Sequence, residues 1–263
     1  MPAAAAVLTT PSRFETRAAS ERREGPAQRR PASVAHMQTH CSTCNLREVC
    51  VPCGLTGADV AELGDLVYTR KRVKRSDALL RAGHPFESIL AIRSGFFKSS
   101  VVLEDGRDQV TGFHMAGEVV GLDGIGAGSH SADVVALEDS EVCVIPYARL
   151  EQPQFQRQLH RIMSRELVRG QGVMTLLGTM RAEERLAAFL LNLSQRFKAR
   201  GFSASEFHLR MTREEIGSYL GLSLETVSRA FSRFQADGLI SVQQKHIVIV
   251  ESEKLRKVML SSD

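Results

Sequence analysis

The part of this sequence that most restricts its fold lies near the C-terminus and predicts two helices joined by a tight turn. Residues 212–215 read Thr-Arg-Glu-Glu, a capping box whose first and last side chains each satisfy a free backbone amide at a helix start. The first helix is predicted to end at about Leu220, and the second to run from Leu224 to about Asp237. Residues 239–250 predict a β-hairpin, which completes a winged helix-turn-helix. Its apolar inner face is predicted to contain Ile216, Leu220, Leu222, Val227 and Phe231, with Gly217 small where the helices cross.

The second of these helices carries a polar face that suits DNA. Glu225, Ser228 and Arg229 are spaced i, i+3 and i+4, so they share one face of the helix. An arginine can bind guanine through two hydrogen bonds, and a glutamate can accept one from cytosine. Arg213, Arg233 and Lys245 are predicted to hold phosphates. The alternative is a helix pair with a purely structural role. It is supported by the balanced charge of residues 205–250, which hold five basic and five acidic side chains.

The middle of the chain, residues 66–146, predicts an antiparallel β structure. Short apolar runs such as 89–92 and 110–113 alternate with Gly, Asp and Ser, which is typical of a roll, barrel or sandwich. Residues 104–107, Glu-Asp-Gly-Arg, predict a hairpin turn because Asp-Gly supplies the positive φ that tight turns need. The glycines between 117 and 128 are interpreted as turn residues, since no Gly-Lys-Ser/Thr follows them.

A long helix is predicted from about Gln154 to Gly201, with a break near Arg181. One seam of this helix is spaced 4, 3, 4 and 3, which is the signature of a two-helix contact, and consists of Met163, Leu167, Gly170, Met174 and Leu177. We expect a dimer contact here, and the alternative is a helix that packs on the β domain. Gly170 and Gly172 cost about 1 kcal/mol each in a helix interior, so we expect the dimer contact to be weak.

Four of the five cysteines lie within thirteen residues, as Cys41-x2-Cys44-x5-Cys50-x2-Cys53. Crowded cysteines in a long chain with an odd cysteine count indicate a metal site more than a disulfide framework. One interpretation is a single zinc ion bound by the four local thiolates. However, the five residues between the two Cys-x2-Cys pairs are fewer than zinc sites of this kind usually have. Another is three of the close cysteines plus the remote Cys143 on a [4Fe–4S] cluster. In a third, Cys143 is simply a buried strand residue.

The remaining features bound the class of protein. Residues 1–36 contain six Arg, three Glu and almost no large apolar side chains, so we expect a disordered tail, with no secretory signal. No apolar run approaches the ~18–20 residues of a membrane span, so no membrane partner is expected. The net charge of +4 permits a nucleic-acid partner without requiring one. No nucleophile–base set or cofactor fingerprint is present, so we expect no enzyme.

Together these pieces resemble the FNR regulators, the oxygen-sensing branch of the cyclic-AMP receptor protein superfamily. The resemblance covers about residues 41–250 and rests on the stretches CSTCNLREVC, VTGFHMAGEVVGLDGIG, AEERLAAFLLNLSQRF, RGFSASEFHLRMTREEIGSYLGLSLETVSR and RFQADGLI. It implies a [4Fe–4S] cluster held by Cys41, Cys44, Cys50 and Cys143, with Cys53 extra to the pattern. It also implies that the Glu-Thr-Val-Ser-Arg helix reads TTGAT-type half-sites across a palindrome, through Glu225, Thr226, Ser228 and Arg229.

The resemblance implies an α+β fold with a cyclic-nucleotide-binding-like β-roll (jelly roll), a long dimerisation helix and a winged helix-turn-helix. The expected divisions are a disordered tail 1–36, a cysteine segment 37–55, the β-roll 56–152, the dimerisation helix 153–181 and the DNA-binding domain 182–263. Cyclic AMP is not expected. The Gly117-Glu118 pair of nucleotide binders is present, but His130-Ser131-Ala132 lacks the arginine that would clamp the phosphate.

The implied function is a cytoplasmic, global regulator that activates or represses genes of anaerobic metabolism. Without oxygen, the cluster favours a homodimer that binds DNA, and oxygen degrades the cluster and weakens both. The regions 105–110 and 122–128 resemble the surfaces that the family shows to RNA polymerase. The alternative is a zinc-based or thiol-based redox transcription factor on the same scaffold, which would be colourless and would not need Cys143.

Overall fold

The computed structural model describes residues 41–66 and 69–260. The predicted disordered tail and the first residues of the cysteine segment, 37–40, lie outside the described residues. The cysteine segment begins with a 3-10 turn, η1 (Cys41–Thr43), and leads into helix α1 (Gly57–Leu66). Among the described residues no helix has the length and apolar character needed to cross a bilayer.

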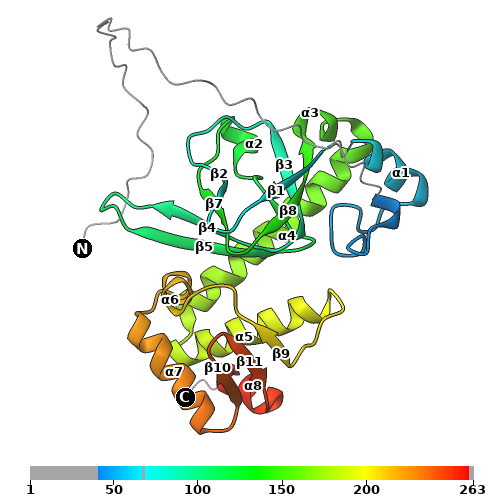
Figure 1. Ribbon diagram of the computed structural model, residues 1–263. Coiled ribbons are helices and arrows are strands. Elements are labelled where there is room, and N and C mark those ends of the chain that lie inside the picture. The colour runs from blue at the N-terminus through cyan, green and yellow to red at the C-terminus, as the bar shows by residue number, and fades with distance from the viewer. Residues whose placement is uncertain (1–40, 67–68, 261–263) are drawn as a thin grey trace, which may run out of the picture. The chain divides into compact units, whose positions relative to one another are not determined.

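The predicted antiparallel β structure is confirmed as two four-stranded sheets that face each other (Figure 1). One sheet has the order β1-β8-β3-β6 and the other β2-β7-β4-β5, and every pairing in them is antiparallel. The strands are β1 (Thr69–Val73), β2 (Ala78–Leu80), β3 (Ser88–Ser94), β4 (Phe96–Val102), β5 (Asp108–Met115), β6 (Val119–Val120), β7 (Asp133–Ala136) and β8 (Ser140–Pro146). Two short helices, α2 (Gly124–Ala127) and α3 (Tyr147–Leu150), accompany them.

The sequence pattern explains this roll. Alternating side chains of the two sheets meet in one apolar layer that includes Ile92, Phe97 and Val142, which are fully buried. The predicted hairpin turn lies between β4 and β5, where Gly106 has φ +81°, a conformation that favours glycine.

The long helix is divided as predicted. Helix α4 (Pro153–Thr179) ends where Met180 becomes extended, and α5 (Ala182–Lys198) begins at once. The backbone amide of Arg181 donates to Glu184 Oε2 at 2.9 Å, which caps the start of α5. The break therefore arises from a local helix-start signal.

The C-terminal elements confirm the winged helix-turn-helix. They are β9 (Glu206–His208), α6 (Arg213–Leu220), α7 (Leu224–Ala236), β10 (Ile240–Gln243), β11 (His246–Ile249) and α8 (Ser252–Leu260), with sheet order β10-β11-β9. Helix α8 was not expected from the sequence, and its fully buried Leu255 joins the same core as α5. This core also takes in Phe96, Val110 and Phe113 of the β4–β5 hairpin.

Candidate functional site

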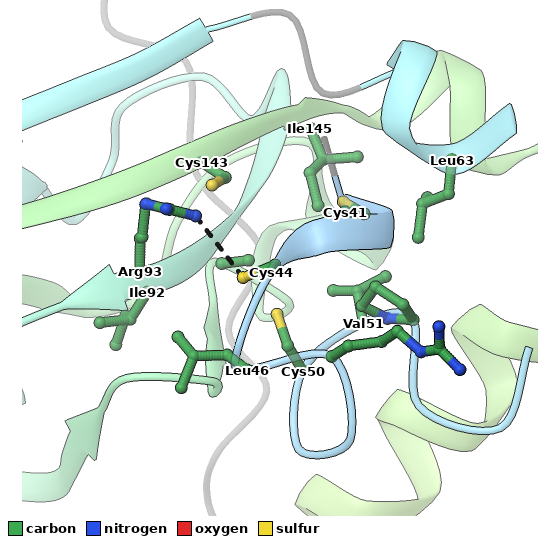
Figure 2. Close-up of a pocket in the computed structure, with 13 residues that line it drawn as sticks. Cys41, Cys44, Leu46, Cys50, Val51, Leu63, Ile92, Arg93, Cys143 and Ile145 are labelled. Atoms are coloured by element: carbon green, nitrogen blue, oxygen red, sulfur yellow. Dashed lines mark hydrogen bonds between the residues drawn. The ribbon is translucent and has the colours of Figure 1, made fainter. Parts of the chain in front are cut away.

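Four cysteines from two distant parts of the chain line one pocket. Cys41, Cys44 and Cys50 come from the cysteine segment, and Cys143 comes from the middle of β8. Figure 2 shows these four side chains gathered around a common space. All are free thiols. Cys53 does not line this pocket, so the structure groups the cysteines in the combination that the family resemblance implies.

Local backbone turns position the three clustered cysteines. The amide of Cys44 donates to the Cys41 carbonyl at 3.3 Å, and the amide of Cys50 donates to the Leu46 carbonyl at 2.9 Å. Leu46 and Val51 are buried and anchor the segment. Cys143 is held differently, because its strand is paired on both sides, opposite Arg70 of β1 and Ala91 of β3. Three cysteines thus lie on a turn-rich segment and one on a sheet.

The pocket is largely apolar, and two arginines, Arg47 and Arg93, also line it. Burial, together with the neighbouring thiols, raises the pKa of Cys41 to about 11. Burial raises the pKa of Cys50 to about 12, and it also raises that of Cys143. Arg93 Nη1 donates to Cys44 Sγ at 3.5 Å, and Arg93 Nε lies 3.4 Å from Glu141 Oε2. Four thiolates crowded here need a positive partner, and iron or zinc would supply one.

The donor set can be compared with what each of these two metals requires. Within the described residues, no group of three or more His, Cys, Asp and Glu side chains has the geometry to hold one metal ion. A tetrahedral zinc with Zn–S bonds of about 2.3 Å would need its sulfurs within about 4 Å of one another. A [4Fe–4S] cluster binds each thiolate to a different iron and takes a wider set of four. Four soft thiol donors around one apolar pocket fit the donor chemistry of an iron–sulfur cluster.

The helix-turn-helix is built by the predicted capping box. The Thr212 amide donates to Glu215 Oε2 at 2.7 Å, and the Glu215 amide donates to Thr212 Oγ1 at 3.1 Å. Helix α7 begins with a second cap, because the Thr226 amide donates to Ser223 Oγ at 3.1 Å. Gly217 is small for a reason other than a helix crossing. A Cβ there would lie 2.6 Å from the carbonyl oxygen of Leu222 in the turn.

The structure separates the predicted DNA-contacting residues into two groups. Glu225 and Arg229 are exposed on α7, while Ser228 and Thr226 are half-buried beside them. Two of the predicted phosphate ligands have protein partners. The Arg213 guanidinium lies 5.1 Å from the centre of the Phe231 ring. Arg233 Nη1 lies 2.8 Å from Glu183 Oε1.

The predicted seam of α4 is largely uncovered. Leu167 is 68% exposed and Met174 is 67% exposed, Gly170 is exposed, and Met163 and Leu177 are half-buried. Val168, which sequence reasoning did not single out, is 64% exposed. The alternative that this seam packs on the β-roll is therefore wrong at its centre.

The residues that would serve a cyclic nucleotide in relatives are engaged by protein groups. Glu118 is 7% exposed, and its carboxylate is bound by Arg169, Arg196 and Arg200. His130 is buried, with Nδ1 3.3 Å from Asp123 Oδ1. Sequence reasoning missed the three arginines, because they lie 51 to 82 positions from Glu118 and no local pattern links them.

Comparisons with known proteins agree with this geometry. The cyclic nucleotide-binding domain model matches residues 70–154, and the Crp-like helix-turn-helix domain model matches residues 184–258. The solved structure of FixK2 from Bradyrhizobium japonicum is similar, with a TM-score of 0.68 and 31% identity, covering 74% of this chain and 98% of that one.

Curated relatives are more similar in sequence. The transcriptional activator protein anr of Pseudomonas aeruginosa is 46% identical over 223 residues, covering 83% of this chain and 91% of the relative. The fumarate and nitrate reduction regulatory protein of Salmonella typhimurium is 43% identical over 221 residues, covering 82% and 88%. The chain therefore belongs to the CRP/FNR family, in which it is an oxygen-responsive transcription regulator of the FNR/Anr type that binds DNA through its helix-turn-helix and is not an enzyme.

Proposed function

We propose that this regulator senses oxygen through a [4Fe–4S] cluster held by Cys41, Cys44, Cys50 and Cys143. The observation that supports this proposal is the single pocket that these four cysteines line and Cys53 does not. When bound, the cluster supplies an oxygen-labile bond between the cysteine segment and the β-roll. The name of the Salmonella relative, a fumarate and nitrate reduction regulator, is in keeping with control of anaerobic metabolism.

In this proposal, other residues of the protein hold the four cysteines in place. Leu46 and Val51 bury the cysteine segment, so its three thiols are held near the sheet. Cys143 stays fixed because β8 is paired on both edges. Arg93 donates a hydrogen bond to Cys44 and places a positive charge beside the four thiols.

The DNA-binding form is proposed to be a homodimer formed along α4. An exposed apolar stripe on a 27-residue helix, including Leu167, Val168 and Met174, is the kind of surface that a second helix covers. A two-fold axis there would set two α7 helices about one DNA turn apart. Glu225, Thr226, Ser228 and Arg229 would then read each TTGAT-type half-site, with Arg213 and Arg233 near the phosphates.

Other parts of the proposal follow from the same resemblance. The domain divisions given above and a cytoplasmic location are retained as proposals. The RNA polymerase contact is also retained as a proposal. Val110 is excluded from it, because its amide donates to Ser218 Oγ at 2.9 Å and faces the helix-turn-helix. The exposed parts of those two regions, which a polymerase could contact, are residues 105–108, Asp123 and residues 126–128.

The test is to purify the protein without oxygen, record its visible absorption and DNA affinity, and then admit air. We expect a brown protein whose broad absorption band bleaches in step with loss of binding to a palindromic duplex. A colourless protein that holds zinc or no metal, and binds DNA equally in air, would replace this proposal with the zinc-based or thiol-based alternative.

A further inference from the structure

The buried carboxylate of Glu118 connects three elements through ion pairs. It lies in the turn between β5 and β6 and is 7% exposed. Its oxygens lie 3.2 Å from Arg169 Nη2 of α4 and 2.7 Å from Arg196 Nη2 of α5. They also lie 2.7 Å from Arg200 Nη2, which comes from the turn just after α5. One anionic side chain of the β-roll therefore holds the helix that carries the apolar seam and the first helix of the DNA-binding unit.

Electrostatics keep the carboxylate of Glu118 and its arginine partners charged. Burial alone would raise the pKa of Glu118, but the three guanidinium groups outweigh burial and lower it to about 2. Arg196 also donates to the Phe113 carbonyl at 2.7 Å, and Arg200 donates to the Ala116 carbonyl. These ion pairs thus fix the orientation of α5 against the β5–β6 turn, because charge-assisted bonds to one carboxylate are directional.

The same turn touches the cysteine segment. Gly117 has φ +88°, and a Cβ built there would lie 2.6 Å from Val49 Cγ2, so Val49 rests directly on the backbone next to Glu118. Val49 lies between Cys44 and Cys50 in sequence. The Ile92 amide donates to the Glu118 carbonyl at 2.8 Å, and the next residue, Arg93, donates to Cys44. Contacts therefore run from the cysteine pocket to Glu118 without a gap.

We infer that Glu118 is a positioning residue that couples the cysteine segment to the DNA-binding unit, by holding Arg169 of α4, Arg196 of α5 and Arg200 just after α5 against the turn on which Val49 rests. This inference rests on the proposed function only for what the cysteine segment senses. The contacts that couple the segment to the DNA-binding unit do not depend on that function. Coupling between two sites is reciprocal, so DNA binding should order the cysteine segment just as an ordered cysteine segment favours DNA binding.

The test uses Arg169→Gln, which breaks only the α4 arm of the cluster. Glu118→Gln is a harsher change, because it leaves three buried guanidinium groups without their anion and can prevent folding. The matched control is Arg165→Gln, one helical turn earlier on α4, which is exposed and lines the same polar hollow beside Glu118. Circular dichroism would establish that both variants fold, and sedimentation would measure their dimer affinity.

Two readouts separate this inference from the proposed function. The first is amide hydrogen exchange of residues 41–54, with and without a palindromic duplex, which does not depend on iron. The second is the ratio of DNA dissociation constants in air and without oxygen. Wild type and Arg165→Gln should show slower exchange on DNA, and Arg169→Gln should lose that protection. In Arg169→Gln the ratio of the two dissociation constants should also fall at least about 5-fold at unchanged iron content.

Each outcome decides something definite. Protection of residues 41–54 in Arg169→Gln equal to that in wild type overturns the inference, as does the absence of protection in wild type. A colourless wild type with equal DNA binding in air overturns the proposed function, and the hydrogen-exchange comparison then still decides the coupling.

Discussion

At the scale of single residues, the most informative contrast is between Cys143 and Cys53. Both are half-buried free thiols, and cysteine count does not distinguish them as ligands. Cys143 lines the pocket shared with Cys41, Cys44 and Cys50, whereas Cys53 lies outside the pocket lining. Cysteine count alone does not separate zinc from iron, and the spacing of the cysteines does not say which remote thiol joins the cluster of close ones. The fold brings Cys143, in the middle of β8, to the pocket that the cysteine segment lines.

Replacing Cys143 with Ser should abolish the visible absorption of protein purified without oxygen. A serine hydroxyl is a poor substitute for one of four thiolate ligands. Cys53→Ser is the matched control, and it should keep wild-type absorption and iron content. Iron retained in Cys143→Ser and lost in Cys53→Ser would show that the four-cysteine pocket is not the cluster site.

Replacing Arg229 with Ala should weaken binding to the specific palindrome by about 1–3 kcal/mol and relax the preference at one base pair, because a bidentate base contact would be lost. Arg233→Ala is the companion variant. Arg233 is predicted to hold a phosphate and also pairs with Glu183, so its loss should weaken binding to all sequences alike and reduce the salt dependence. Fluorescence anisotropy with a series of single-base variants measures both effects. Equal losses on every sequence for Arg229→Ala would contradict base reading.

At the scale of elements, the signals that could be predicted are local ones. The capping box at Thr212, the hairpin turn at Gly106 and the break near Arg181 each depend on neighbouring residues, and the structure contains all three. Helix α8 was missed because its sequence offers a weak start signal and only one fully buried residue, Leu255. The arginine partners of Glu118 could not be predicted, because their meeting depends on how α4 and α5 return to the β-roll.

Replacing Gly170 with Ala should tighten dimerisation of the cluster-free protein. No atom lies within 4 Å of a Cβ at this position, so the protomer accepts a methyl group, and the helix gains about 1 kcal/mol in propensity. The added methyl also fills a gap in the apolar stripe beside Leu167. Analytical sedimentation would give the dimer affinity, and an unchanged or weaker dimer would contradict a seam that runs through Gly170.

At the scale of the whole molecule, folding stability should depend on pH through two enclosed groups. Burial lowers the pKa of His114 to about 4 from 6.5, and its Nδ1 has no hydrogen-bond partner among the described residues. The unfolded chain takes up this proton below pH 6.5 and the native protein does not, so acid favours unfolding. Glu118 adds a second loss, because its pKa is lowered to about 2 from 4.5.

The expected result is a free energy of unfolding that falls by up to about 3 kcal/mol on account of His114 between pH 6.5 and 4, and falls further between pH 4.5 and 2 on account of Glu118. Denaturant titration of the cluster-free protein across this range would measure it. His114→Gln serves as the control, since it lacks the first group and should flatten the curve between pH 6.5 and 4. An unaltered slope in that variant would assign the acid sensitivity to other residues.

The cysteine segment is also fastened at its far end. Gln158 of α4 is 2% exposed, and its Nε2 donates to the Cys53 carbonyl at 3.1 Å and to the Val51 carbonyl. A segment tied this close to the sheet keeps its three thiols at a high effective concentration relative to Cys143 even when nothing bridges them. In the proposed sensor, reassembly of a lost cluster would therefore start from ligands that are already gathered, and the regulator would be reset by repair as well as replaced by new synthesis.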